Sequence, residues 1–173
     1  MGERDPERRD RVAKRLHPEV LEQIETGVKT AWIPIEQDAQ FVDAILDVYG
    51  IEDGMELWRA YTRRFVETGL MKAFIDGTVR IFGLSLASLS RVVPRAWQQS
   101  YRGCGEGKVT VQEGRKAAIV EFTGMHPEQM KREGYFILLR GLILGLHDIV
   151  GAKDQLDVAI DRGERSYTLI LRW

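Results

Sequence analysis

The chain has 173 residues, of which 44% are hydrophobic and 29% are charged, and its formal net charge at pH 7 is −1. This length supports one domain with its own core, and the near-neutral charge argues against nucleic acid or anionic lipid as a partner. The single cysteine, Cys104, excludes an intramolecular disulfide and a zinc site built from several thiolates. This cysteine usage, together with an N-terminus that has no signal-peptide character, predicts a cytoplasmic location.

The first segment, residues 1–15, carries six bases and four acids and few apolar residues. We expect it to be a flexible charged arm, either disordered or folded as a charge-laced helix. Arg8, Arg9 and Arg11 in this arm are candidates for binding a protein partner.

The rest of the chain is predicted to be a single domain, residues 16–173, whose first half (16–102) is helical. Apolar residues recur there at helical spacing, and Gly50 is expected to end one of the helices. Ser85 can cap a later helix, and Pro94 in its interior predicts a kink or a break between two short helices.

Charges are segregated along this helical half. Residues 36–58 hold seven acids and no base, whereas residues 59–102 hold eight bases and two acids. Either the two segments complement each other within the fold, or they form two faces for different partners. No recognition motif accompanies the bases, so no nucleic-acid partner is predicted.

The second half, residues 105–173, has the pattern of two β-hairpins on either side of a long helix. The glycine-rich segment RGCGEGK (102–108) predicts a hinge loop before the first hairpin. Alternating apolar residues predict strands around turns at Gly114 and Gly163, and Pro127 lies where the first turn of the long helix is expected. The fold class is therefore α+β: an N-terminal helical layer packed on a four-to-five-stranded antiparallel sheet, with a ββαββ C-terminal half.

Three glycines mark the long central helix: Gly134, Gly141 and Gly145. At 100° per residue they lie within about 40° of one another and form a smooth stripe. They cost about 2–3 kcal/mol of helix propensity, which close packing on the sheet or against a partner helix can offset. The alternative is that they leave room for a ligand. Because Arg140 interrupts the apolar run, which falls short of the roughly 20 residues of a bilayer span, no transmembrane segment is predicted.

No nucleotide-binding, metalloprotease or serine-hydrolase motif occurs, and we therefore predict a protein that is not an enzyme. The histidines, His17, His126 and His147, are too scattered in sequence to indicate a metal site, so no metal or other cofactor is predicted. If a ligand pocket exists, we expect it where the two halves meet, near Trp97 and Tyr101, with His147 as a further candidate.

Four sequence patterns resemble a known superfamily. They are PRAWQQSYRGCG (94–105), EFTG (121–124), GYFILLRGLILGL (134–146) and DRGERSYTLILRW (161–173). With the segments before them, over about residues 32–173, they resemble a bacterial branch of the superfamily that unites haem-NO-binding-like domains, 4-vinyl-reductase domains and TRAPP transport-particle subunits. The resemblance implies a helical layer against an antiparallel sheet, often in a homodimer, in domains that sense small ligands or scaffold signalling and trafficking complexes.

The cofactor residues of this superfamily are missing from the sequence. Haem-binding members hold iron through a histidine in the helical part and hold the propionates with a Tyr-x-Ser-x-Arg motif. This chain has no histidine between His17 and His126 and lacks that motif. Some 4-vinyl-reductase domains carry a cysteine-rich zinc site near the final hairpin, where this chain has no thiol. We therefore expect neither haem nor zinc.

Two hypotheses for function follow. The leading one is a non-enzymatic signalling or scaffolding domain that forms a homodimer and contacts a protein partner in signalling or cell organisation. The alternative is a sensor domain that binds a small apolar ligand in a pocket between its helical and sheet halves.

Overall fold

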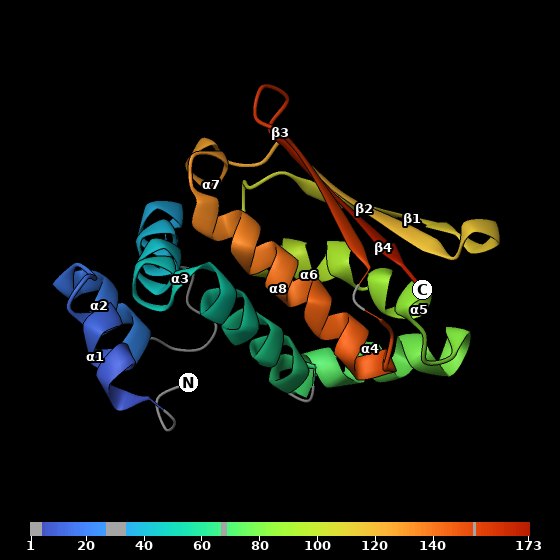
Figure 1. The fold of residues 1–173 in the computed structure, drawn as a ribbon, viewed down its shortest axis with the longest axis horizontal. Helices are drawn as coiled ribbons and strands as arrows, with labels where there is room; N and C mark the ends of the chain where they lie inside the picture. The colour runs from blue at the N-terminus through green and yellow to red at the C-terminus, as the bar shows by residue number, and fades with distance from the viewer. Residues whose placement is uncertain (1–4, 27–33, 67–68, 154) are drawn as a thin grey trace.

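The computed structural model describes residues 5–26, 34–66, 69–153 and 155–173 (Figure 1). Its helices are α1 (Pro6–Ala13), α2 (Pro18–Thr26), α3 (Ile35–Phe65), α4 (Gly69–Phe82), α5 (Leu86–Ser90), α6 (Val93–Ser100), α7 (Pro127–Met130) and α8 (Glu133–Val150). Its strands are β1 (Glu106–Gln112), β2 (Ala117–Thr123), β3 (Leu156–Asp161) and β4 (Ser166–Arg172), with the short 3₁₀ helix η1 (Glu113–Arg115) joining β1 to β2. The predicted α+β class and the four-stranded antiparallel sheet are confirmed.

The four strands form one sheet in the order β1-β2-β4-β3. On its inner face Phe122 pairs with Tyr167 and Val120 pairs with Leu169, and all four side chains are buried. The alternate residues point outward and are more exposed, as in an antiparallel sheet that has water on one side. Helices α5, α6 and α8 lie on the inner side of this sheet (Figure 1).

Helix α8 lies between the sheet and helix α3 (Figure 1). Toward the sheet, the Phe136 ring stacks on the Tyr167 ring with their centroids 5.2 Å apart. The Tyr167 hydroxyl also donates a hydrogen bond to the Phe136 carbonyl, at an O···O distance of 3.2 Å. These contacts fix the position of α8 over the centre of the sheet.

The long helix expected from Pro127 onward is divided in two. Arg132 has extended backbone angles (φ −114°, ψ 121°) between α7 and α8. Its guanidinium forms an ion pair with Asp43 of α3. A tertiary contact of this kind leaves no mark on local helical periodicity. The sequence pattern therefore predicted one long helix where the structure has α7 and α8.

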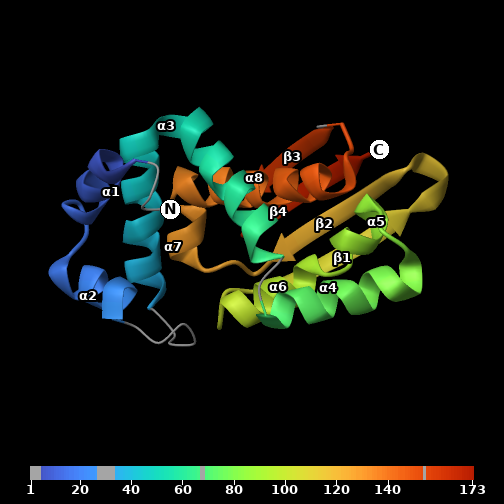
Figure 2. The ribbon, with the colours of Figure 1, turned by 90° about the horizontal axis from the view of Figure 1, so that it is seen from below.

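Helix α3 bends at Gly50, as the predicted helix end there indicated. Gly50 has φ 76° and ψ −179°, inside an otherwise helical element. A positive φ is accessible to glycine at little cost. The bend directs the second half of α3 across α8, against which it packs (Figure 2).

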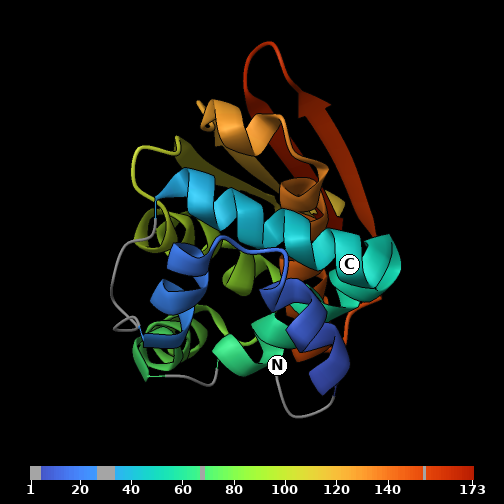
Figure 3. The same cartoon turned by 90° about the vertical axis from the view of Figure 1, so that its left-hand side faces the viewer.

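Part of the predicted flexible arm, residues 1–15, is helical in the structure. The Asp5 side chain caps α1 by accepting the Arg8 backbone N–H, at 2.9 Å, and Val12 is buried. Helices α1 and α2 lie against α3 on the side away from the sheet (Figure 3). Of the two alternatives for this segment, the described residues 6–13 take the charge-laced helix.

The break predicted at Pro94 separates α5 from α6, and Pro94 lies in the first turn of α6. The predicted cap is also present, because the Ser85 side chain accepts the Ser88 backbone N–H at 3.1 Å. Helix α6 passes close over β1: a Cβ on Gly107 would lie 3.1 Å from the Pro94 Cα. This close approach places the inner face of α6, with Trp97, against the sheet.

Candidate functional site

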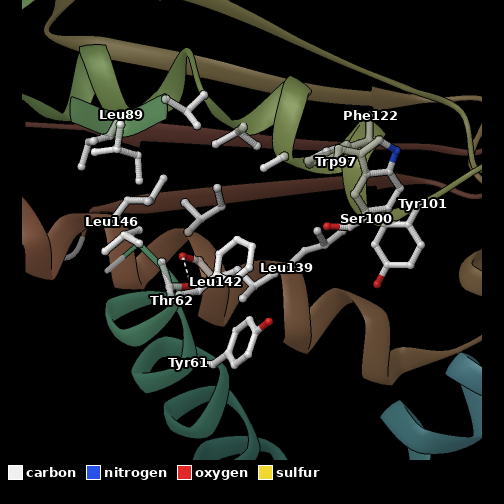
Figure 4. Close-up of a pocket in the computed structure, with 17 residues that line it drawn as sticks. Tyr61, Thr62, Leu89, Trp97, Ser100, Tyr101, Phe122, Leu139, Leu142 and Leu146 are labelled. Atoms are coloured by element: carbon white, nitrogen blue, oxygen red, sulfur yellow. Dashed lines mark hydrogen bonds between the residues drawn. The ribbon is translucent and has the colours of Figure 1, made fainter. Parts of the chain in front are cut away.

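A small apolar cavity, cavity 1, lies where the helices meet the sheet. Its volume is about 180 Å³, and its walls come from α3, α4, α5, α6, α8 and β2 (Figure 4). Of its 17 lining residues, four carry a hydroxyl group (Tyr61, Thr62, Ser100 and Tyr101) and none carries a charge. An interior surface of this kind suits an apolar molecule.

Aromatic side chains form one end of cavity 1. The Trp97 ring centroid lies 4.4 Å from that of Tyr101 and 4.7 Å from that of Phe122. The Trp97 indole N–H donates to the Cys104 carbonyl, at an N···O distance of 3.2 Å, which fixes the orientation of the indole ring. Leu89 and Leu146 line the opposite end (Figure 4).

In the wall formed by α3 and α8, the hydroxyl group of Thr62 has a hydrogen-bond partner. The Thr62 hydroxyl donates to the Leu142 carbonyl at 3.0 Å, shown as a dashed line in Figure 4. A paired hydroxyl has less need of an ordered water, so this part of cavity 1 keeps its apolar character.

A second cavity, cavity 2, adjoins the first and has a different chemistry. Its volume is about 700 Å³, and it shares four lining residues with cavity 1 (Tyr61, Ser100, Tyr101 and Leu142). The rest of its wall comes from the first half of α3 and its N-cap Pro34, from Trp58 in the second half of α3, from the loop after α6, from α8 and from His126. Unlike cavity 1, it includes charged side chains.

Asp38 is the carboxylate in the wall of cavity 2. The Tyr135 hydroxyl of α8 donates a hydrogen bond to its Oδ2. Burial raises the pKa of Asp38 above its ordinary value, and hydrogen bonds from Tyr135 and Tyr101 lower it in part. Burial and the nearby Asp38 carboxylate raise the pKa of Tyr135 and of Tyr101. Both phenols therefore stay protonated and act as hydrogen-bond donors.

The structure brings two of the three predicted pocket residues together. Trp97 and Tyr101 both line cavity 1, and Tyr101 also lines cavity 2. His147 lines neither cavity: it is fully buried near the end of α8, with its Nδ1 3.2 Å from the Ile143 carbonyl oxygen of the same helix. That a ligand contacts Trp97 and Tyr101 stays a prediction.

The three glycines of α8 face helix α3. A Cβ on Gly134 would lie 2.8 Å from Val42 Cγ1, and one on Gly145 would lie 2.5 Å from Thr62 Cβ. A Cβ on Gly141 would lie 2.5 Å from the Met55 carbonyl oxygen. These distances leave no room for a ligand on this face. Of the two surfaces that we considered for close packing, the glycines contact the helix and not the sheet.

The arginines proposed for partner binding make contacts within the chain. Arg8 forms an ion pair with Asp53 of α3 at 2.7 Å, and its guanidinium lies 5.1 Å from the centroid of the Tyr49 ring. Arg9 pairs with Asp10 at 3.3 Å, and Arg11 is exposed. A role for these arginines in binding a partner stays a prediction.

Apart from Tyr101, sequence reasoning missed the residues that place hydroxyl groups and a carboxylate around the cavities. Asp38 was one of seven acids in an acidic segment, and Tyr135 was one apolar position of the central helix. Tyr61 and Thr62 lie on α3, opposite α8, in positions that the sequence assigned to an amphipathic helix. A signal for Asp38 was its spacing from Val42 and Ile45, four and seven residues further on, which places it on the side of the helix that carries these buried residues.

No protein-family model matches the sequence, and a search of curated proteins finds no match. A solved structure from a study of heme distortion in the H-NOX family is similar, with a TM-score of 0.56 over 98% of this chain and 88% of that chain. The chain has an H-NOX-like fold. The two sequences are 16% identical, so the similarity concerns the fold. It agrees with the resemblance to haem-NO-binding-like domains.

Haem is the group that an H-NOX-like fold implies, and the residues of cavity 1 do not fit it. Among the described residues, no histidine, cysteine or methionine lines this cavity. Burial raises the pKa of Tyr61 and of Tyr101, which disfavours the phenolate that would bind iron. A cavity of about 180 Å³ is also close in size to one that holds benzene, and a porphyrin is several times larger.

Cavity 2 does not offer a better haem site. Burial and the neighbouring carboxylates raise the pKa of Cys104, which disfavours an iron-binding thiolate. His126 also lines this cavity, and its Nδ1 accepts the Glu128 backbone N–H at 3.3 Å. A porphyrin bound there would place its apolar ring against the Asp38 carboxylate, at a large desolvation cost.

In the described part of the chain, no three or more His, Cys, Asp or Glu side chains form a cluster that could hold a metal ion. None of the described helices is both long enough and apolar enough to cross a membrane.

Proposed function

We propose that this protein is a sensor domain that binds a small apolar molecule in cavity 1. The observation that carries the proposal is an uncharged cavity of about 180 Å³ between the helical and sheet halves. The H-NOX-like fold supports it, because the similar structure belongs to a family studied for a bound group, haem.

The size and lining of cavity 1 define the class of ligand. An apolar protein cavity of about 150 Å³ binds benzene or xenon. Cavity 1 therefore suits an uncharged molecule of about the size of a single aromatic ring. Stacking on Trp97 and Tyr101 at one end of the cavity favours an aromatic ligand over an aliphatic one of equal size.

Ligand binding in cavity 1 can produce a signal because the walls of this cavity belong to both the helical half and the sheet half of the domain. Residues of α3, α6, α8 and β2 line the same cavity, so a ligand contacts both halves of the domain. A ligand that binds one arrangement of these elements more tightly than another shifts the population toward it.

The scaffolding hypothesis rested on the absence of a catalytic motif and on the segregated surface charges. Many of these charges have partners within the chain. In the acidic segment, Asp43 pairs with Arg132 and Asp53 pairs with Arg8. In the basic segment, Arg63 pairs with Asp148 of α8 at 3.0 Å. These partners lie within the fold, but none of the three pairs joins the acidic segment to the basic one. Charges that are paired within the chain are weaker support for a partner-binding surface.

Benzene is the probe that tests the proposal. We expect benzene at tenfold above its Kd to raise the melting temperature by about 3–6 °C. Ala96→Phe, which fills cavity 1 from α6, is expected to abolish this rise. Gln98→Phe adds the same ring at an exposed position of the same helix and is expected to retain it. A rise that persists in Ala96→Phe would show that benzene binds elsewhere and would contradict the proposal.

Five further properties of this protein stay predictions. They are its membership of the wider superfamily with 4-vinyl-reductase domains and TRAPP subunits, its bacterial origin, its homodimeric state, its cytoplasmic location and its lack of enzymatic activity. Sedimentation velocity of the purified chain would test the homodimer directly.

A further inference from the structure

Cavity 2 contains a carboxylate that has no counter-ion among the described residues. Asp38 accepts a hydrogen bond from the Tyr135 hydroxyl and forms no ion pair among the described residues. Its pKa is raised chiefly by burial. A buried carboxylate that has only neutral hydrogen-bond partners is stabilised when a cation approaches it.

Aromatic side chains make up much of the same wall. Phe41, Trp58, Tyr61 and Tyr101 all line cavity 2. The first three form a chain of edge-to-face contacts, with ring centroids 6.3 Å apart between Phe41 and Trp58 and 6.0 Å apart between Trp58 and Tyr61. Aromatic rings gathered in this way attract organic cations through their negative faces.

The other described titratable groups that line cavity 2 leave its preference for a cation in place. Burial raises the pKa of the Cys104 thiol and of the Tyr61 and Tyr101 phenols, which keeps them uncharged. Arg102 is exposed at the loop, where solvent screens its charge. His126 accepts the Glu128 N–H through Nδ1, and this acceptor role requires an unprotonated Nδ1.

We propose that cavity 2 binds an organic cation, with its ammonium group between the Asp38 carboxylate and the aromatic side chains of α3. Its volume of about 700 Å³ falls in the range of sites for small organic molecules. This site goes beyond the proposed function, because it is a different cavity and takes a ligand of different chemistry.

A matched pair of probes tests the proposal by calorimetry. Choline carries a quaternary ammonium group, and 3,3-dimethylbutan-1-ol is its uncharged isostere of nearly the same shape. We expect choline to bind at least about tenfold more tightly than the alcohol, because only choline gains the carboxylate and the ring faces. Equal binding of the two probes, or no detectable binding of choline at about 10 mM, would overturn the proposal.

Variants identify the site. Asp38→Asn keeps an oxygen for the Tyr135 hydroxyl and removes the charge, and it is expected to weaken choline binding about tenfold. Phe41→Leu keeps an apolar side chain and removes a ring, and it is expected to weaken choline binding about threefold. Asp47→Asn, an exposed change on the same helix that removes the same charge, is expected to have no effect. Choline binding unchanged in both Asp38→Asn and Phe41→Leu would overturn the proposal.

The two proposals can fail separately. Ala96→Phe blocks cavity 1, and Ala96 does not line cavity 2. This variant is expected to lose benzene binding and to bind choline with unchanged affinity. Loss of choline binding in Ala96→Phe would overturn the assignment of the cation to cavity 2.

Discussion

Helix α8 presents two very different surfaces to its neighbours. On one side Gly141 and Gly145 bring the backbone against α3, with no space for a single added carbon. About 130° around the same helix, Leu139, Leu142 and Ile143 line cavity 1. The glycines therefore leave no cavity, because they let the backbones of α8 and α3 come into direct contact. The cavity lies beside large side chains whose neighbours, on several different elements, do not fill the volume between them.

The largest expected effect comes from adding methyl groups to the glycine side of α8, which packs against α3. The double variant Gly141→Ala, Gly145→Ala gains helix propensity but forces each new Cβ into contact with α3. We expect a net loss of about 3–5 kcal/mol in the free energy of unfolding, measured by urea denaturation.

Gly77→Ala in α4 is the matched control, since nothing lies within 4 Å of the position of its Cβ. It is expected to stabilise the protein by about 0.5–1 kcal/mol, the helix-propensity gain alone. If the double variant were as stable as Gly77→Ala, the close contact between α8 and α3 would be wrong.

Truncating a side chain on the side of α8 that lines cavity 1 should cost less stability and should change ligand selectivity. Ile143→Ala removes a buried side chain that already faces a cavity, so we expect a loss near the lower end of the usual range, about 2 kcal/mol. The enlarged cavity should admit a larger aromatic probe such as naphthalene, which the native cavity excludes. Naphthalene binding of equal strength in both proteins would show that cavity 1 does not limit the size of the ligand.

An ion pair at the end of α8 links the helix to α3. The guanidinium of Arg59 donates to the Asp148 carboxylate, with an Nε···Oδ2 distance of 2.7 Å. This bond, and the charges of Arg59 and Arg63, lower the pKa of Asp148 below its ordinary value. The stability that Asp148 contributes is therefore present above its unfolded pKa and is lost as the pH falls through its lower folded pKa.

Asp148→Asn is expected to lower the free energy of unfolding by about 1–2 kcal/mol at pH 7. The difference from the native protein should shrink in acid, where the native carboxylate is protonated as well. A pH-independent difference would mean that the Asp148 charge is not what holds α8 to α3.

The smallest expected effect has the opposite dependence on pH. Because burial raises the pKa of Asp38, its contribution to stability is present below its unfolded pKa and is lost as the pH rises through its folded pKa. Relative to the native protein, Asp38→Asn should therefore become more stable as the pH rises above the ordinary value for an aspartate. Denaturation curves at several pH values would measure this, and a difference that falls with rising pH would contradict the burial of Asp38.

Much of the fold could be predicted from the sequence, because local patterns report it. Strand alternation gave the two hairpins, and Gly50 and Pro94 gave the bend and the break in the helical half. The glycine stripe indicated a close approach by another segment. The stripe did not indicate which segment approaches, because a smooth helix surface can pack equally well against a sheet or against another helix.

The candidate site was less accessible to sequence reasoning. Trp97 and Tyr101 could be singled out as aromatic residues at the junction of the two halves, and both line cavity 1. The burial of Asp38 depends on Tyr135, which is 97 positions away in the chain. His147 was chosen for its place near the end of a helix, and local spacing does not tell which neighbours surround it.

A crystal structure of the protein under xenon pressure would show directly whether cavity 1 is an open, apolar binding site. We expect a xenon atom in cavity 1, among Trp97, Leu139 and Leu142, and no xenon in crystals of Ala96→Phe. A native crystal in which side chains fill this volume and no xenon binds would rule out a ligand-binding cavity at this place.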